Sequence, residues 1–170
     1  MPPAWRVLKG LGVSELHKFL FDGLPVRGMV VRLTDTWTEI LRRRASNSNN
    51  VAYADPVRDM LGEMTAAAAL MQANIKFDGS LVLQIFGDGP VKVAVVEVQP
   101  DLALRATATV VGAVEANATL SQMVNVGNEG RCAITLDPIP KLPGPQPYQG
   151  AAPLFDDRRQ HPANLSAALQ

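Results

Sequence analysis

The stretch DPVRDMLGEMTAAAALMQANIKFDGSLVLQIFGDGPVKVAVVEV, Asp55 to Val98, changes its hydrophobic period part-way along. Its second half holds two short runs, SLVLQIF and VKVAVVEV, in which apolar residues recur with the period of a strand. Its first half carries apolar residues at spacings of three and four, which is typical of a helix with one buried face: Val57, Met60, Leu61, Met64, Ala67, Ala68, Met71 and Ile75. The stretch therefore predicts a long helix followed by an antiparallel hairpin.

The predicted helix has a clear start and small side chains at its centre. Asp55 is a good N-cap residue, and Pro56 suits the first helical position, where its missing N–H leaves no bond unmade. The alanine-rich centre carries little side-chain bulk, so a neighbouring element can approach its backbone closely. The three methionines could form an adaptable binding face, but a buried stripe is the favoured interpretation.

The flanking segments extend the same pattern. Before the stretch, LHKFLFDGLPVRGMVVRL (Leu16 to Leu33) predicts two short strands about a DGLP turn. TDTWTEILRRR then predicts a short helix, with Thr36 and Glu39 at capping-box spacing. After the stretch, LALRATATVV, RCAITL and YQGAAPL predict three more strands, with one helical turn at 120–124. The proline-dense DPIPKLPGPQP (Asp137 to Pro147) is predicted to be a connection and not a central strand.

These elements predict an α+β fold, in which a mostly antiparallel sheet of meander hairpins packs against a long alanine-rich helix and a shorter helix. The length of 170 residues fits one domain. Residues 1–13 contain prolines and glycines and are expected to be a flexible extension, so the domain is expected to occupy residues 14–170.

Composition narrows the classes of function. Sixteen basic and sixteen acidic side chains cancel, which argues against broad electrostatic capture of nucleic acid or of an anionic membrane. No segment approaches the roughly 20 apolar residues needed to span a bilayer. A single cysteine, Cys132, excludes an intramolecular disulfide and a multi-cysteine zinc site. It fits a reducing compartment, so a cytoplasmic location is expected.

The GDGP segment, Gly87 to Pro90, raises the question of a phosphate-binding loop. Such a loop needs backbone N–H groups at a helix amino terminus, whereas VKVAVVEV follows here with the period of a strand. The spacing matches neither nucleotide-binding glycine pattern, and Pro90 removes one donor. A hairpin corner is favoured, with Gly87 and Gly89 supplying positive φ and Asp88 bonding nearby backbone.

No catalytic constellation stands out. His17 is interpreted as a hydrogen-bonded surface residue, His161 and the pair Asp156 and Asp157 as solvated loop residues, and Cys132 as an inert core thiol. The run of three arginines at 42–44 is expected to complement a helix carboxyl end and to face water. We expect no catalytic residue, no metal ligand and no cofactor, and a non-enzymatic domain that acts through its surface.

The order of the segments is more specific than their chemistry. LHKFLFDGLPVRGMVVRL, the run from Pro56 to Glu97, LRATATV and YQG resemble the amino-terminal domain of the redox-regulated thirty-three-kilodalton heat-shock chaperone family of bacteria. The resemblance runs from Leu16 to Leu169. Its most specific pieces are VRG at Val26 to Gly28, KFDG at Lys76 to Gly79, and GDGP.

The resemblance implies an ATP-independent holdase of the cytoplasm that binds unfolding client proteins during oxidative and heat stress. In that family four cysteines of a carboxyl-terminal domain hold zinc while reduced, and their oxidation to disulfides exposes apolar surface and favours dimers. None of those cysteines occurs in this chain, so the zinc-binding redox-switch domain is expected to be absent. The segment NLSAALQ (Asn164 to Gln170) suggests that the core domain is truncated within its last helix.

The resemblance leaves the client-binding surface unknown, and two alternatives stay open. One is a small-ligand or anion-binding β domain that uses the glycine loops. The other is a constitutive dimerisation domain. Two departures from the family pattern bear on these alternatives. Phe86 stands where a polar residue is common and would add apolar surface if exposed. The segment NVGNEG (Asn125 to Gly130) is more polar than the usual small-residue loop.

Overall fold

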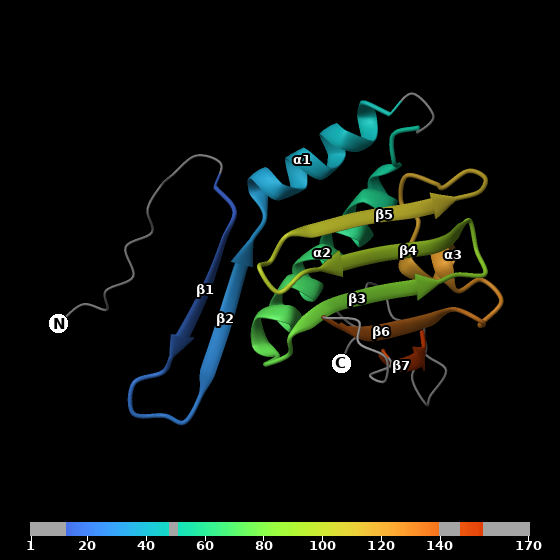
Figure 1. Cartoon of the computed structure of the whole chain (residues 1–170). Helices are drawn as coiled ribbons and strands as arrows, with labels where there is room; N and C mark the ends of the chain where they lie inside the picture. Colours follow the sequence, from blue (N-terminus) through green and yellow to red (C-terminus); the bar gives the residue numbers. More distant parts are fainter. Residues whose placement is uncertain (1–12, 48–50, 140–146, 155–170) are drawn as a thin grey trace.

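The computed structural model describes residues 13–47, 51–139 and 147–154 (Figure 1). The predicted α+β class is confirmed. The described elements follow in chain order: β1 (Glu15–Leu20), β2 (Arg27–Arg32), α1 (Thr34–Ala45), α2 (Asp55–Asn74), β3 (Gly79–Phe86), β4 (Val91–Val98), β5 (Leu104–Val110), α3 (Leu120–Val124), β6 (Arg131–Pro138) and β7 (Tyr148–Pro153).

Two sheets divide the strands. A five-stranded antiparallel sheet has the order β5-β4-β3-β6-β7, and β1 and β2 pair with each other in a separate two-stranded sheet. Leu83 at the centre of the larger sheet is paired with Val96 on one side and Ile134 on the other. Helix α2 crosses one face of this sheet, and the β1–β2 hairpin stands beside it (Figure 1).

The core lies between α2 and the five-stranded sheet. Val57, Leu61 and Met64 of α2 are fully buried, as are Leu83 and Val96 of the sheet. Each such side chain contributes about 1.5–3 kcal/mol relative to exposure. The predicted stripe of methionines packs in or against this core, and the slim alanine-rich centre of α2 is buried on the sheet. The periodicity that predicted α2 therefore reflects burial.

The predicted caps of the two longer helices are wrong. Helix α2 begins at Asp55 with Ala54 as its N-cap and no side-chain cap bond, while Asp55 forms an ion pair with Arg58 at 3.1 Å. Pro56 does lie in the first turn, as predicted. Helix α1 begins at Thr34, before the expected capping box. Its Glu39 instead binds two arginines of its own helix, Arg42 and Arg43.

The GDGP segment joins β3 to β4 as a hairpin corner, but its glycines serve a different purpose from the one expected. Positive φ among the described glycines occurs at Gly23 and Gly112, not at Gly87 or Gly89. A Cβ at Gly87 would lie 2.1 Å from the Val91 carbonyl oxygen, and one at Gly89 would lie 2.5 Å from that of Met123. Close approach of other backbone therefore requires glycine at both positions.

Strand β6 runs further than predicted, through Asp137 to Pro138. The proline is tolerated there because β7 pairs with β6 only from Arg131 to Leu136. Within the described ranges, Pro138 therefore has a strand neighbour on one side alone. Several predictions concern residues outside the described ranges: the flexible extension up to residue 12, Asp156, Asp157, His161 and the helix from Asn164.

Candidate functional site

The β1–β2 hairpin is largely exposed. Its turn closes with a hydrogen bond from the Phe21 N–H to the Val26 carbonyl at 3.0 Å, and Gly23 takes the positive φ of 72° that the turn requires. No residue of β1 or β2 is buried. A strand pair with so little buried surface depends on its contacts with the helices for its position.

Aromatic and aliphatic side chains share the outer face of the hairpin, defined here as Phe19, Phe21, Val26 and Val30. These side chains are between 41% and 55% exposed. The rings of Phe19 and Phe21 meet edge to face with centroids 5.6 Å apart, and the Phe19 ring lies over Gly28 of β2. Exposed apolar side chains that adjoin one another on a soluble domain are typical of an interaction site.

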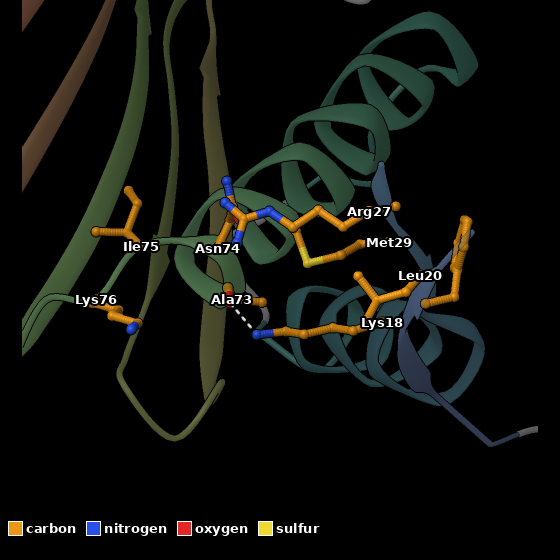
Figure 2. Close-up of a pocket in the computed structure, with 10 residues that line it drawn as sticks. Lys18, Leu20, Arg27, Met29, Ala73, Asn74, Ile75 and Lys76 are labelled. Carbon is orange, nitrogen blue, oxygen red and sulfur yellow. Dashed lines mark hydrogen bonds between the residues drawn. The ribbon is translucent and has the colours of Figure 1, made fainter. Parts of the chain in front are cut away.

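The inner face of the hairpin forms a groove with the carboxyl-terminal end of α2 (Figure 2). The groove has a volume of about 730 Å³. Register places Lys18 opposite Met29 and Leu20 opposite Arg27. These four side chains reach toward residues 73–76, at the end of α2 and just beyond it (Figure 2).

The charges in the groove are of one sign. Lys18 Nζ donates a hydrogen bond to the carbonyl of Ala73, which places a cation at a helix end that has no basic residue in its own last turn. Arg27 and Lys76 also line the groove, and neither has an ion-pair partner among the described residues. No aspartate or glutamate occurs among the described residues that line it. The groove is therefore cationic and partly apolar.

Comparison with known proteins identifies the family that this architecture represents. The family model described as Hsp33 protein matches residues 14–160. The chain belongs to the Hsp33 family. The 33 kDa chaperonin of Chromobacterium violaceum is 43% identical over 144 residues, covering 85% of this chain and 45% of that protein. That of Methylobacillus flagellatus is 41% identical over 142 residues, covering 83% of this chain and 44% of that protein.

A solved structure shows the same fold. The 33 kDa chaperonin from Thermotoga maritima superposes with a TM-score of 0.59, covering 82% of this chain and 45% of that one, at 19% identity. The chain thus spans a little under half the length of the Hsp33-family proteins that it matches. The matched relatives are named as chaperonins, which is not a class of enzyme. None of the helices in the described ranges is long and apolar enough to cross a membrane.

In this Hsp33-family domain, backbone N–H groups of the glycine-containing loop at 125–130 are hydrogen-bonded to a carboxylate of the protein itself. Asp88 Oδ2 accepts hydrogen bonds from the N–H groups of Gly127 at 2.7 Å and Glu129 at 3.0 Å. The Gly87 N–H donates to the Lys92 carbonyl across the hairpin. Asp88 thus bonds mainly a loop distant in sequence, in addition to the nearby backbone that the sequence predicts. Because an internal carboxylate fills these donors, the alternative of an external anion at this loop loses its main support.

The remaining predicted residues lie apart from the groove. His17 Nε2 lies 3.1 Å from Glu15 Oε2 at the surface of β1, as predicted. Cys132 is buried in β6, and burial raises the pKa of its thiol, which keeps it protonated and unreactive. The described residues bring no three histidine, cysteine, aspartate or glutamate side chains together as a metal site.

The three arginines at the end of α1 have separate partners. Arg42 and Arg43 face water and hydrogen-bond Glu39, and together they lower the pKa of that carboxyl to about 2. Arg44 instead stacks over the Tyr53 ring, 3.5 Å from its centroid. The prediction of solvated arginines is therefore confirmed for two of the three.

Phe86 is the other exposed aromatic residue of interest. It is 41% exposed, and its strand position puts it on the sheet face away from α2, since its neighbour Ile85 is buried on the α2 side. The apolar surface expected of this departure from the family pattern is present.

Sequence reasoning predicted the hairpin as two strands but did not single out its surface. A signal was available: apolar residues occupy both faces of the Leu16 to Leu33 segment, where a half-buried strand pair would carry polar residues on one.

Proposed function

We propose that this chain is the client-binding part of an ATP-independent holdase chaperone that holds unfolding proteins in the cytoplasm during oxidative and heat stress. One observation carries the proposal: an exposed apolar hairpin stands beside a well-packed core in a chain of the Hsp33 family. The clients are proteins that have lost part of their own packing and therefore expose apolar segments.

The physical basis is reciprocal burial of apolar surface. Three apolar side chains of the hairpin stay outside the core of the domain. Phe21 is 49% exposed, Leu24 is 61% exposed and Val26 is 47% exposed. A client segment that covers them gains about 25 cal/mol per Å² of apolar surface removed from water. Such binding needs no nucleotide, because its driving force is the transfer of apolar surface and not a chemical step.

We propose further that oxidation regulates the full-length members of the family. The zinc ion on which that regulation depends is not placed in this chain. Cys132 is buried, and the described residues bring no other cysteine or histidine near it as a ligand. These residues do not fit a zinc site.

The test is light scattering from a thermally unfolding model protein with increasing amounts of this chain and no ATP. We expect suppression of aggregation at a few-fold molar excess. Leu24→Ser combined with Val26→Ser removes apolar surface at the hairpin tip, so about tenfold more chain should be needed for equal protection.

The matched control is Val111→Ser combined with Val126→Ser, because these valines are 59% and 65% exposed and lie outside the hairpin. We expect it to protect as the unmodified chain does. Failure of the unmodified chain to protect at several-fold excess would contradict the proposal, as would equal loss in both double variants. Sedimentation of the chain alone separates client binding from self-association and tests the alternative of a constitutive dimerisation domain.

A further inference from the structure

We infer that the groove between the hairpin and the end of α2 recognises extended client segments in which carboxylate side chains lie next to apolar ones. This inference rests on the proposed holdase function and specifies which segments the domain prefers. The occupant is thus an acidic and apolar stretch of an unfolded protein.

The groove carries an excess of positive charge. Lys18, Arg27 and Lys76 line the groove without a carboxylate among the other lining residues. The chain as a whole has a formal net charge of zero, so this excess of positive charge is local. Complementary charge at an interface selects partners and raises the rate of encounter. A segment with glutamate or aspartate supplies that complement.

The cations of the groove have different roles. Lys18 donates a hydrogen bond to the Ala73 carbonyl and so holds β1 against the end of α2. Arg27 and Lys76 have no hydrogen-bond or ion-pair partner among the described residues. Arg27 comes from β2, and Lys76 follows α2, so both can bind carboxylates without breaking an internal bond (Figure 2).

Part of the groove lining is apolar. Leu20 is 80% exposed and Ile75 is 38% exposed. Met29 of β2 also lines the groove, with a flexible side chain that repacks around different partners. A groove of about 730 Å³ is large enough for several side chains of a bound segment. A client segment with only acidic side chains would leave this apolar lining exposed to water. We therefore expect the recognised segments to contain apolar residues as well.

The test is fluorescence anisotropy with labelled synthetic peptides of equal length. One peptide alternates glutamate with leucine and phenylalanine, and its partner carries lysine in place of each glutamate. We expect the glutamate peptide to bind about tenfold more tightly at low salt, and the difference to shrink at high salt. Combining Arg27→Glu with Lys76→Glu should reverse the preference.

The matched control is Lys92→Glu combined with Arg131→Glu, which makes the same change of net charge at exposed positions outside the groove. We expect this variant to keep the preference for glutamate. Circular dichroism of each variant checks the fold, and a variant that unfolds is replaced by Arg27→Gln with Lys76→Gln, for which loss of the preference is expected.

Equal binding of the two peptides by the unmodified chain would overturn the inference, as would an unchanged preference in the groove variant. Those results would leave the holdase proposal standing if the unmodified chain still suppresses aggregation. Preferential binding of the glutamate peptide without any suppression of aggregation would support the groove and contradict the holdase.

Discussion

The carboxylate of Asp88 connects two segments that are far apart in the sequence, through hydrogen bonds from the N–H groups of Gly127 and Glu129. Burial by itself would raise the pKa of this group, but hydrogen bonds from the backbone N–H groups of Glu129, Gly127 and Val126 outweigh burial and lower it. The ionised form is thus favoured in the folded state. Through it the hairpin corner is bound to the loop before β6.

A prediction at the residue scale follows from this pKa. A lowered folded-state pKa means that the stabilising contribution is complete above the ordinary aspartate range and is lost as pH falls below about 4. Asp88→Asn should therefore lower the free energy of unfolding at pH 7 by about 1–2 kcal/mol, through weaker bonds to the two amides. The difference from the unmodified chain should diminish toward pH 3.

Urea unfolding at both pH values measures this effect. Asp59→Asn is the control, because Asp59 is an exposed aspartate of α2 without a hydrogen-bond or ion-pair partner among the described residues. Equal stability of Asp88→Asn and the unmodified chain at pH 7 would show that the amides are satisfied equally well without the charge.

At the scale of the element, Tyr53 protects the edge of the larger sheet. Among the described strands, β5 has a neighbour on one side only. On its free side the Ala108 N–H donates to the Tyr53 hydroxyl at 2.7 Å, and that hydroxyl donates to the Ala108 carbonyl at 3.1 Å. The Arg44 guanidinium stacks on the face of the Tyr53 ring and so helps to hold the ring in place. An unprotected edge invites pairing with another chain.

We expect Tyr53→Phe to expose this edge. Loss of the hydroxyl leaves one backbone donor and one acceptor without their partner, which should cost about 1 kcal/mol of the free energy of unfolding and promote self-association. Urea unfolding and sedimentation velocity over a range of concentrations measure the two effects. Tyr148→Phe is the control, since Tyr148 is 68% exposed and its hydroxyl has no partner among the described residues.

At the scale of the whole molecule, the hairpin and the core differ in how firmly they are held. Strands β3 and β4 lie inside the larger sheet and contain fully buried side chains. The hairpin is anchored mainly where β2 packs on α2, with added hydrogen bonds from Lys18 to Ala73 and from the Thr36 N–H to Ser14 Oγ. Its apolar surface thus belongs to the less stable part of the fold.

Native-state hydrogen exchange tests this difference. We expect amides of β1 and β2 to be at least about a hundredfold less protected than those of β3 and β4, because local opening of the hairpin exposes little buried surface. A bound glutamate-containing peptide should raise protection in the hairpin and at residues 73–76, which line the same groove. Equal protection in both sheets would show that the hairpin opens only with the whole domain.

Local patterns predicted most of the elements but not their ends. Helix α2 and the strands follow from hydrophobic period, because burial of one face imposes that period on the chain. The predicted N-caps of α1 and α2 are wrong because several residues near the start of a helix can act as its N-cap. A reciprocal capping box instead occurs at α3, between Thr119 and Gln122. Gly87 and Gly89 were recognised as necessary for the wrong reason, since the backbone that crowds them comes partly from α3.

Short-range periodicity, turn residues and the order of segments were enough to predict the α+β class, the order of helices and hairpins, and the family. Which apolar residues remain exposed depends on how the segments pack together: Leu61 is fully buried and Leu20 is 80% exposed. The same packing brings Lys18, Arg27 and Lys76 to one groove. The physical reason is that burial and local charge depend on contacts between segments far apart in the chain, which no single segment encodes.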